Sequence, residues 1–162
     1  MSVSSREALI EAYLSSPPRL RKAVADLGPE QLKARPVPGR WSTLEVVCHL
    51  VDSDQIGCHR MKRVIAEDRP LLIGYDETRF TATLPYHEAD LEAELALLEK
   101  MREQMARILR GLPDSAWSRT GVHNEHGLMT LEVLLRGYVE HVPHHLAHIF
   151  EKRKALGLPT EG

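Results

Sequence analysis

The chain has 162 residues, 43% of them hydrophobic, which suits one domain around one core, and we expect a single domain over residues 1–162. Its 21 basic and 23 acidic residues give a net charge of -2, which argues against the long-range field of a nucleic-acid binder. The apolar runs are too short to cross a membrane and the first residues resemble an amphipathic helix, so we expect a cytoplasmic protein with neither a nucleic-acid nor a membrane partner.

The first two predicted helices follow from the positions of Pro and Gly, which cluster at 28–40, 69–77 and 111–127 and leave four long stretches between them. The first stretch, about 5–27, contains Pro17 and Pro18, which should bend or split a helix because neither can donate a backbone hydrogen bond. The second, about 42–68, begins with Ser-Thr-Leu-Glu, the pattern of a capping box in which the serine and Glu45 satisfy free backbone donors.

The second predicted helix also contains both cysteines, Cys48 and Cys58. On one helix they would be separated by about 15 Å of rise, whereas a disulfide needs Cα atoms within about 7 Å. We therefore expect two reduced thiols. Cys48 could take part in thiolate chemistry, although a single cysteine on an apolar helix is more often a small core residue.

The third helix, about 88–110, carries a leucine and methionine seam at alternating spacings of three and four, interrupted only by Arg102. The fourth runs from about Thr130 to the stop at Gly157. No segment alternates apolar and polar residues long enough to indicate a sheet, so the predicted fold class is all-α, a four-helix bundle. The 69–87 connection is long for a bundle, which favours a crossover from one end to the other.

Four of the nine histidines fall within eight positions of the fourth helix, in the stretch EHVPHHLAHIF. Residues four apart share a helix face, so His141 with His145, or His144 with His148, could point at one ion. From the centre of the helix's apolar stripe, the first pair lies roughly 65° to 105° away and the second roughly 125° to 165°. The first pair therefore borders the core and the second faces solvent. Alone, such a spacing is more often a solvated face than a metal site.

A third candidate metal ligand is identified by resemblance to a known protein family. The stretches WSTLEVVCHLVDSDQIGCHRM and EHVPHHLAHI resemble the DinB/YfiT-like superfamily of metalloenzymes, in which the first motif contributes one histidine and the second an H-x-x-x-H pair. On this chain these are His49, His141 and His145. The resemblance also takes in Asp52 with the serine after it, Arg60, a segment over 70–77 and an H-x-E-x-G-x-x-T-L connection over 123–131.

The resemblance implies an up-down-down-up bundle, a homodimer, and one divalent ion (Zn, Ni, Fe or Mn) held by the three histidines. Pro143 departs from a regular helix between two of the ligands, and it either helps to aim them or spoils the site. Paired histidines are frequent in YfiT-like proteins where this chain has Cys48 and His49.

The leading hypothesis is a metal-dependent enzyme acting on a small-molecule substrate, either a hydrolase that activates water or a transferase that activates a low-molecular-weight thiol. Asp52 would orient an imidazole or accept a proton, and Arg60 would receive an anionic substrate group, although both residue types on a helix flank are usually ion-pair partners. The rival hypothesis is a non-catalytic, stress-related bundle with adventitious metal or none. Residues 75–77 are expected to shape the pocket, and His123 and His126 to lie in a surface loop near its mouth.

Overall fold

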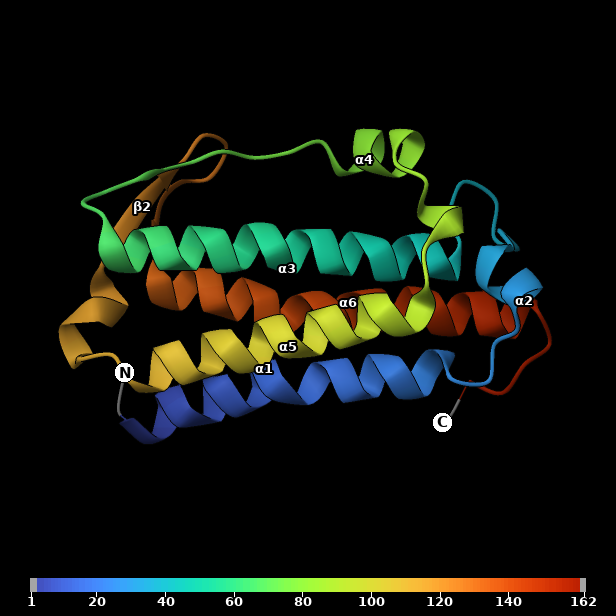
Figure 1. Cartoon of the computed structure of the whole chain (residues 1–162), viewed down its shortest axis with the longest axis horizontal. Helices are drawn as coiled ribbons and strands as arrows, with labels where there is room; N and C mark the ends of the chain where they lie inside the picture. The colour runs from blue at the N-terminus through green and yellow to red at the C-terminus, as the bar shows by residue number, and fades with distance from the viewer. Residues whose placement is uncertain (1–2, 161–162) are drawn as a thin grey trace.

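Four long helices form the body of the protein in the computed structural model, which describes residues 3–160. Helices α3 and α5 pack on each other, as do α1 and α6, and the remaining neighbours in the ring are α1 with α5 and α3 with α6. Figure 1 shows α1 and α6 running in one direction and α3 and α5 in the other. The predicted up-down-down-up bundle is confirmed, with helices α1 (Val3–Val24), α3 (Thr43–Ala66), α5 (Leu91–Arg110) and α6 (Leu131–Ala155).

The connection between α3 and α5 returns along the length of α3, as Figure 1 shows in green. It contains a two-residue strand, the short helix α4 and a turn of 3₁₀ helix, the last two packed on α3. The predicted crossover is therefore present, although its short elements were not predicted: β1 (Leu71–Leu72), α4 (Glu77–Thr83) and η1 (Tyr86–Glu88).

A small three-stranded sheet closes one end of the bundle, in the order β1-β2-β3. Strand β2 (Thr120–His123) pairs parallel with β1 and antiparallel with β3 (Gly127–Thr130). The sequence pattern does not predict this sheet, because strands of two to four residues are too short to show an alternating pattern. Two short helical segments, α2 (Pro29–Lys33) and η2 (Asp114–Ser118), complete the elements of residues 3–160.

The start of α3 follows the predicted capping box. The Ser42 hydroxyl accepts a hydrogen bond from the Glu45 backbone N–H at 3.2 Å, and the Glu45 carboxylate accepts one from the Ser42 backbone N–H at 2.6 Å. These bonds satisfy two free donors of the first turn. They also determine where the helix begins, and so the face on which His49 lies.

Helix α1 runs through Pro17 and Pro18 as one helix, so of the two predicted outcomes, a bend or a split, the split does not occur. Pro17 cannot donate to the carbonyl of Tyr13, but two side chains replace that donor. The Arg102 guanidinium donates to the Tyr13 carbonyl at 2.9 Å, and the Ser16 hydroxyl donates to the same oxygen at 3.1 Å. Two side chains, one of them from α5, thus satisfy the acceptor that Pro17 leaves free.

Arg102, the polar interruption in the α5 seam, is fully buried and links all four helices. Its guanidinium donates to both carboxylate oxygens of Asp54 at 2.8 and 2.7 Å and to the Tyr138 carbonyl at 3.1 Å. Along each helix, this network separates two buried apolar clusters, one near each end of the bundle. The three predicted metal ligands come from the half that contains the start of α3 and the end of α6.

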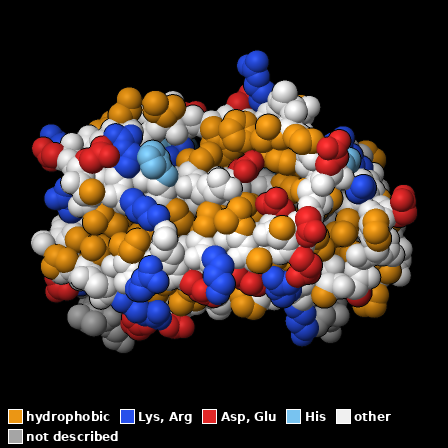
Figure 2. Space-filling model, in the orientation of Figure 1, with side chains coloured by type: hydrophobic (Ala, Val, Ile, Leu, Met, Phe, Trp, Pro, Cys, Tyr) orange, Lys and Arg blue, Asp and Glu red, His pale blue; other side chains and the backbone are white. Residues whose placement is uncertain are grey.

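The surface is mixed in charge, as the near-neutral composition predicts. Figure 2 shows Lys and Arg side chains interspersed with Asp and Glu over one face. Several form ion pairs between α1 and α5, including Arg21 with Glu99 at 2.8 Å and Arg110 with Glu7 at 2.7 Å. Exposed pairs of this kind contribute little to stability. Within residues 3–160, no helix combines the length and apolar character needed to cross a membrane.

Candidate metal centre

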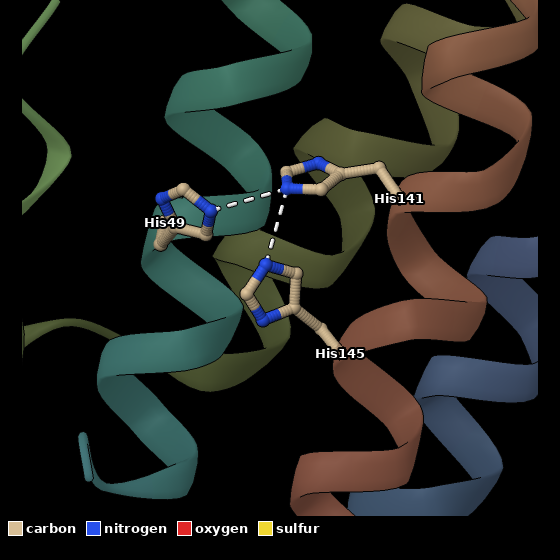
Figure 3. A group of neighbouring side chains, drawn as sticks. All are labelled: His49, His141 and His145. Atoms are coloured by element: carbon tan, nitrogen blue, oxygen red, sulfur yellow. Dashed lines mark hydrogen bonds between the residues drawn. The ribbon is translucent and has the colours of Figure 1, made fainter.

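Three imidazoles converge between α3 and α6 (Figure 3). His141 Nε2 lies 3.2 Å from His49 Nε2 and 3.1 Å from His145 Nε2. His49 is buried, with 2% of its surface exposed, and the other two are half-buried. The structure therefore brings together the three histidines that the sequence motifs selected.

Helix α6 delivers two of them because it continues through Pro143 as one helix. His141 and His145 are one turn apart, and their rings meet edge to face with centroids 4.7 Å apart. Of the two consequences foreseen for Pro143, a disrupted pair is not observed. The proline lies between two imidazoles that still point at a common region.

All three imidazoles are neutral at pH 7. Burial lowers the pKa of His49 to about 4, although the charge of Asp52 acts in the opposite direction. Burial, together with neighbouring imidazoles, lowers the pKa of His141 to about 3 and that of His145 to about 2. Neutral imidazoles have the free nitrogen lone pairs that metal binding requires.

The geometry of the cluster fits a divalent ion. Bonds of about 2.0–2.1 Å to a tetrahedral zinc would place ligand nitrogens about 3.3 Å apart, close to the 3.1 and 3.2 Å observed here. The buried Nδ1 atoms of His141 and His145 have no hydrogen-bond partner among the described residues, and the Nε2 atoms of the three rings, within hydrogen-bond distance of one another, face a common region. The residues present are those that such an ion would use.

The other two histidines of the α6 motif lie outside this group. His144 is exposed, and His148 has its Nδ1 atom 3.8 Å from the Glu151 carboxylate. Their rings contact each other with centroids 5.0 Å apart. Their positions agree with the prediction from the apolar stripe of this helix, which placed His144 and His148 on the solvent side.

The Glu77 carboxylate approaches the cluster, whereas the sequence predicts only a pocket-shaping role for this residue. Its carboxylate lies 3.6 Å from His49 Nε2. Glu77 begins α4, so the crossover carries the carboxylate over the face of α3. Glu77 is the last residue of the 70–77 segment that resembles the family. Its position relative to His49, however, depends on how the crossover folds back along α3.

The two residues predicted to be catalytic occupy different places. The Asp52 carboxylate accepts a hydrogen bond from the Tyr86 hydroxyl, and its effect at His49 is the electrostatic one described above. The Arg60 guanidinium donates to the Ile73 carbonyl at 2.5 Å and to the Tyr138 hydroxyl at 3.4 Å, which ties the crossover to α3 and α6.

Glu77 lines two cavities, of which the smaller also borders the cluster. The larger, about 500 Å³, is lined by Arg60 and Tyr138 and extends to the β2–β3 hairpin. The smaller, about 370 Å³, is lined by His145 itself. Each is large enough for a small molecule.

The hairpin places His123, Glu125 and His126 along the larger cavity. These three groups also lie within 4.8 Å of one another. However, His123 Nδ1 accepts a hydrogen bond from the Glu125 backbone N–H at 3.2 Å, which leaves the proton of the neutral ring on Nε2. His123 is thus a hydrogen-bond donor toward its surroundings rather than a free metal ligand.

Cys48 is a core residue. It is buried in one of the two apolar clusters, and burial raises the pKa of its thiol to about 12. Cys58 is also buried, and both cysteines are free thiols. The predicted absence of a disulfide is confirmed, and Cys48 is not poised as a thiolate nucleophile.

A family model described as the DinB superfamily matches residues 12–149. The relative "Putative metal-dependent hydrolase YfiT" of Bacillus subtilis is 31% identical over 158 residues, covering 97% of this chain and 89% of the relative. A second putative metal-dependent hydrolase, from Oceanobacillus iheyensis, is 33% identical over 133 residues, covering 82% of this chain and 77% of the relative.

Two solved structures are similar to the whole bundle. YfiT from Bacillus subtilis, described as a probable metal-dependent hydrolase with an unusual four-helix bundle topology, matches with a TM-score of 0.91 and 31% identity, covering 98% of this chain and 91% of that one. The mycothiol-dependent maleylpyruvate isomerase matches with a TM-score of 0.66 at 14% identity, covering 92% of this chain and 60% of that one. The second likeness shows the fold alone.

Proposed function

This chain belongs to the DinB superfamily, and we propose that it is a metal-dependent hydrolase in which His49, His141 and His145 hold a divalent ion. The observation that carries the proposal is the convergence of three neutral imidazole nitrogens between two helices. When bound there, a divalent ion would supply Lewis acidity, which lowers the pKa of water or of a thiol. Three neutral ligands leave its charge uncompensated.

Glu77 is the proposed proton acceptor. Its carboxylate lies 3.6 Å from His49 Nε2 and borders both cavities, so a nucleophile beside the cluster is within reach of Oε2. More than half of its side-chain surface is exposed, which allows the proton to pass on to solvent.

Asp52 is proposed to act as a positioning residue. Its charge favours a basic imidazole at His49, and its hydrogen bond with the Tyr86 hydroxyl holds the carboxylate in place. Arg60 is proposed to contact a polar part of the substrate in the larger cavity, which it lines. Its Nη1 and Nη2 atoms already donate hydrogen bonds to the Tyr138 hydroxyl and the Ile73 carbonyl.

Transfer of a small thiol is the second candidate activity. The same ligand set can activate a thiol, and the fold is shared with an enzyme that uses mycothiol. Hydrolysis of activated esters and amides in the absence of any thiol supports the hydrolase. Turnover of an electrophile only when a small thiol is present supports the transferase.

Metal analysis of untagged protein tests the site itself. The His145→Ala and His49→Ala variants should lose most of the bound metal because two remaining ligands leave the ion largely to water. Their matched controls, His148→Ala and His144→Ala, should retain it. Loss of metal in the controls with retention in the other two variants would show that His144 and His148, and not His49 and His145, hold the ion. Protein that is metal-free before any substitution would instead favour the non-catalytic bundle.

A homodimer is also proposed, and a solution mass at high concentration tests it.

A further inference from the structure

Lys152 of α6 is a buried cation without an acidic partner. Only 2% of its surface is exposed, and its Nζ atom donates to the His148 carbonyl at 3.1 Å. Among residues 3–160, no carboxylate lies within the 4.0 Å of an ion pair with it. Burial of an ammonium group with one neutral acceptor is unfavourable, and it also lowers the pKa of Lys152.

The two acidic groups that act on this charge, Glu151 and Glu45, offset its burial only in part, and the pKa of Lys152 stays lowered. Glu45 is engaged by the Arg35 guanidinium and by the Ser42 backbone. Glu151 is exposed on the neighbouring position of the helix and faces His148. The ammonium group of Lys152 therefore retains donors that the folded chain does not satisfy with a charge.

Lys152 lines the smaller cavity beside the metal centre, together with His145 and Arg40. It follows His145 by seven residues, two helical turns on the same face, and helical side chains lean toward the N-terminus, so its ammonium group is directed toward the cluster. Arg40 also lines the cavity and is exposed, and within residues 3–160 its guanidinium has no hydrogen-bond or ion-pair partner.

The charges of the two cavities distinguish them. The smaller is lined by two cations, Arg40 and Lys152, and by one carboxylate, Glu77. The larger is lined by one cation, Arg60, and by three carboxylates. An anion is therefore favoured in the smaller cavity and opposed in the larger one.

We propose that Lys152 and Arg40 form an oxyanion subsite that binds a carboxylate, sulfonate or phosphate group of the substrate beside His145. The proposal rests on the proposed function only in assigning the anion to a substrate. It places the anionic end of that molecule in the smaller cavity and leaves the larger cavity to the rest of it.

Calorimetric titration with inorganic sulfate tests the subsite without any turnover. The wild type should bind sulfate at low ionic strength, and Lys152→Met should weaken that binding at least about tenfold because the buried cation supplies the main contact. Arg40→Met, at an exposed position, should weaken it by about two- to fivefold. The matched control is Lys154→Met, which removes the same charge from an exposed position of the same helix, and it should bind within about twofold of the wild type.

Three results would overturn the subsite: no sulfate binding to the wild type at millimolar concentration, equal affinity in Lys152→Met and the wild type, or equal loss in Lys154→Met. A fourth would be loss of binding when metal is removed by chelation and dialysis, because the anion would then be held by the ion. Lys152→Met should melt at the same or a higher temperature than the wild type, since methionine removes a buried charge, so weaker binding cannot be attributed to unfolding. Failure of the subsite leaves the metal content of the His145→Ala and His148→Ala variants unaffected, which keeps the two proposals separable.

Discussion

Substitution of Gly57 by alanine should destabilise the protein, although alanine is the better helix former. Gly57 lies in the middle of α3, and its Cα faces the ring of Tyr138 on α6. An added Cβ would lie 2.5 Å from Cε1 and 2.7 Å from Cε2 of that ring, and closer still to Cζ. Tyr138 is 9% exposed and its hydroxyl contacts Arg60, so a rigid ring would have to move together with its helix.

The size of the effect follows from two opposing contributions. Overpacking a rigid contact costs about 3 kcal/mol, the upper part of the usual range, whereas replacing a helical glycine by alanine gains about 1 kcal/mol. The net loss is about 2 kcal/mol, which for a chain of this length lowers Tm by about 4–8 °C.

Gly137→Ala is the matched control. Gly137 lies inside α6, and a Cβ there would have no atom within 4 Å apart from its chain neighbours and the nearby backbone of its own helix. The same substitution should therefore gain about 0.5–1 kcal/mol and raise Tm by about 1–4 °C. Thermal unfolding followed by circular dichroism measures both variants. Equal stability of Gly57→Ala and Gly137→Ala would refute the packing argument, as would a Gly57→Ala penalty that persists when Tyr138 is also replaced by alanine.

Three further outcomes are expected from buried groups. Arg102→Met should lose about 3–5 kcal/mol in urea unfolding, because it leaves the Asp54 carboxylate buried without a cation and with only the Tyr13 hydroxyl as a donor. Asp54→Leu in the same chain should recover most of that loss, and a loss below about 1 kcal/mol would contradict this reasoning. Burial raises the pKa of Glu45, but hydrogen bonds led by that from Arg35 outweigh it and hold the pKa below its usual range. The stability that Glu45 contributes is then present above its ordinary pKa of about 4.3, and it is lost as pH falls through the lower pKa of the folded protein. Glu45→Gln should therefore cost more stability at pH 7 than at pH 3. A stability cost that does not depend on pH would contradict this prediction. The Cys48 thiol should react with a thiol reagent only on unfolding, and rapid reaction of the native protein would show that its burial is misjudged.

Local sequence signals were sufficient for the four long helices. The capping box at Ser42 and the proline and glycine clusters depend on neighbouring residues, and such interactions are the same in any fold. The periodic apolar stripe of α6 likewise separated His141 and His145 from His144 and His148, since helical spacing alone determines which face a residue occupies. The short strands and the helices α2 and α4 were missed because few residues carry too little periodic information.

Contacts between distant segments decided the rest. Periodicity placed Arg102 as an interruption of an apolar seam, but only the packed bundle shows that it supplies the donor that Pro17 cannot and pairs with Asp54. The meeting of His49 with the α6 pair required a family resemblance to predict, since helical spacing relates only residues of the same helix. The approach of Glu77 to the cluster arises from the fold of the crossover. A sequence determines which side of its own helix each residue occupies, whereas the neighbour across the interface depends on how the helices pack, and at this site the packing brings three imidazoles together between α3 and α6.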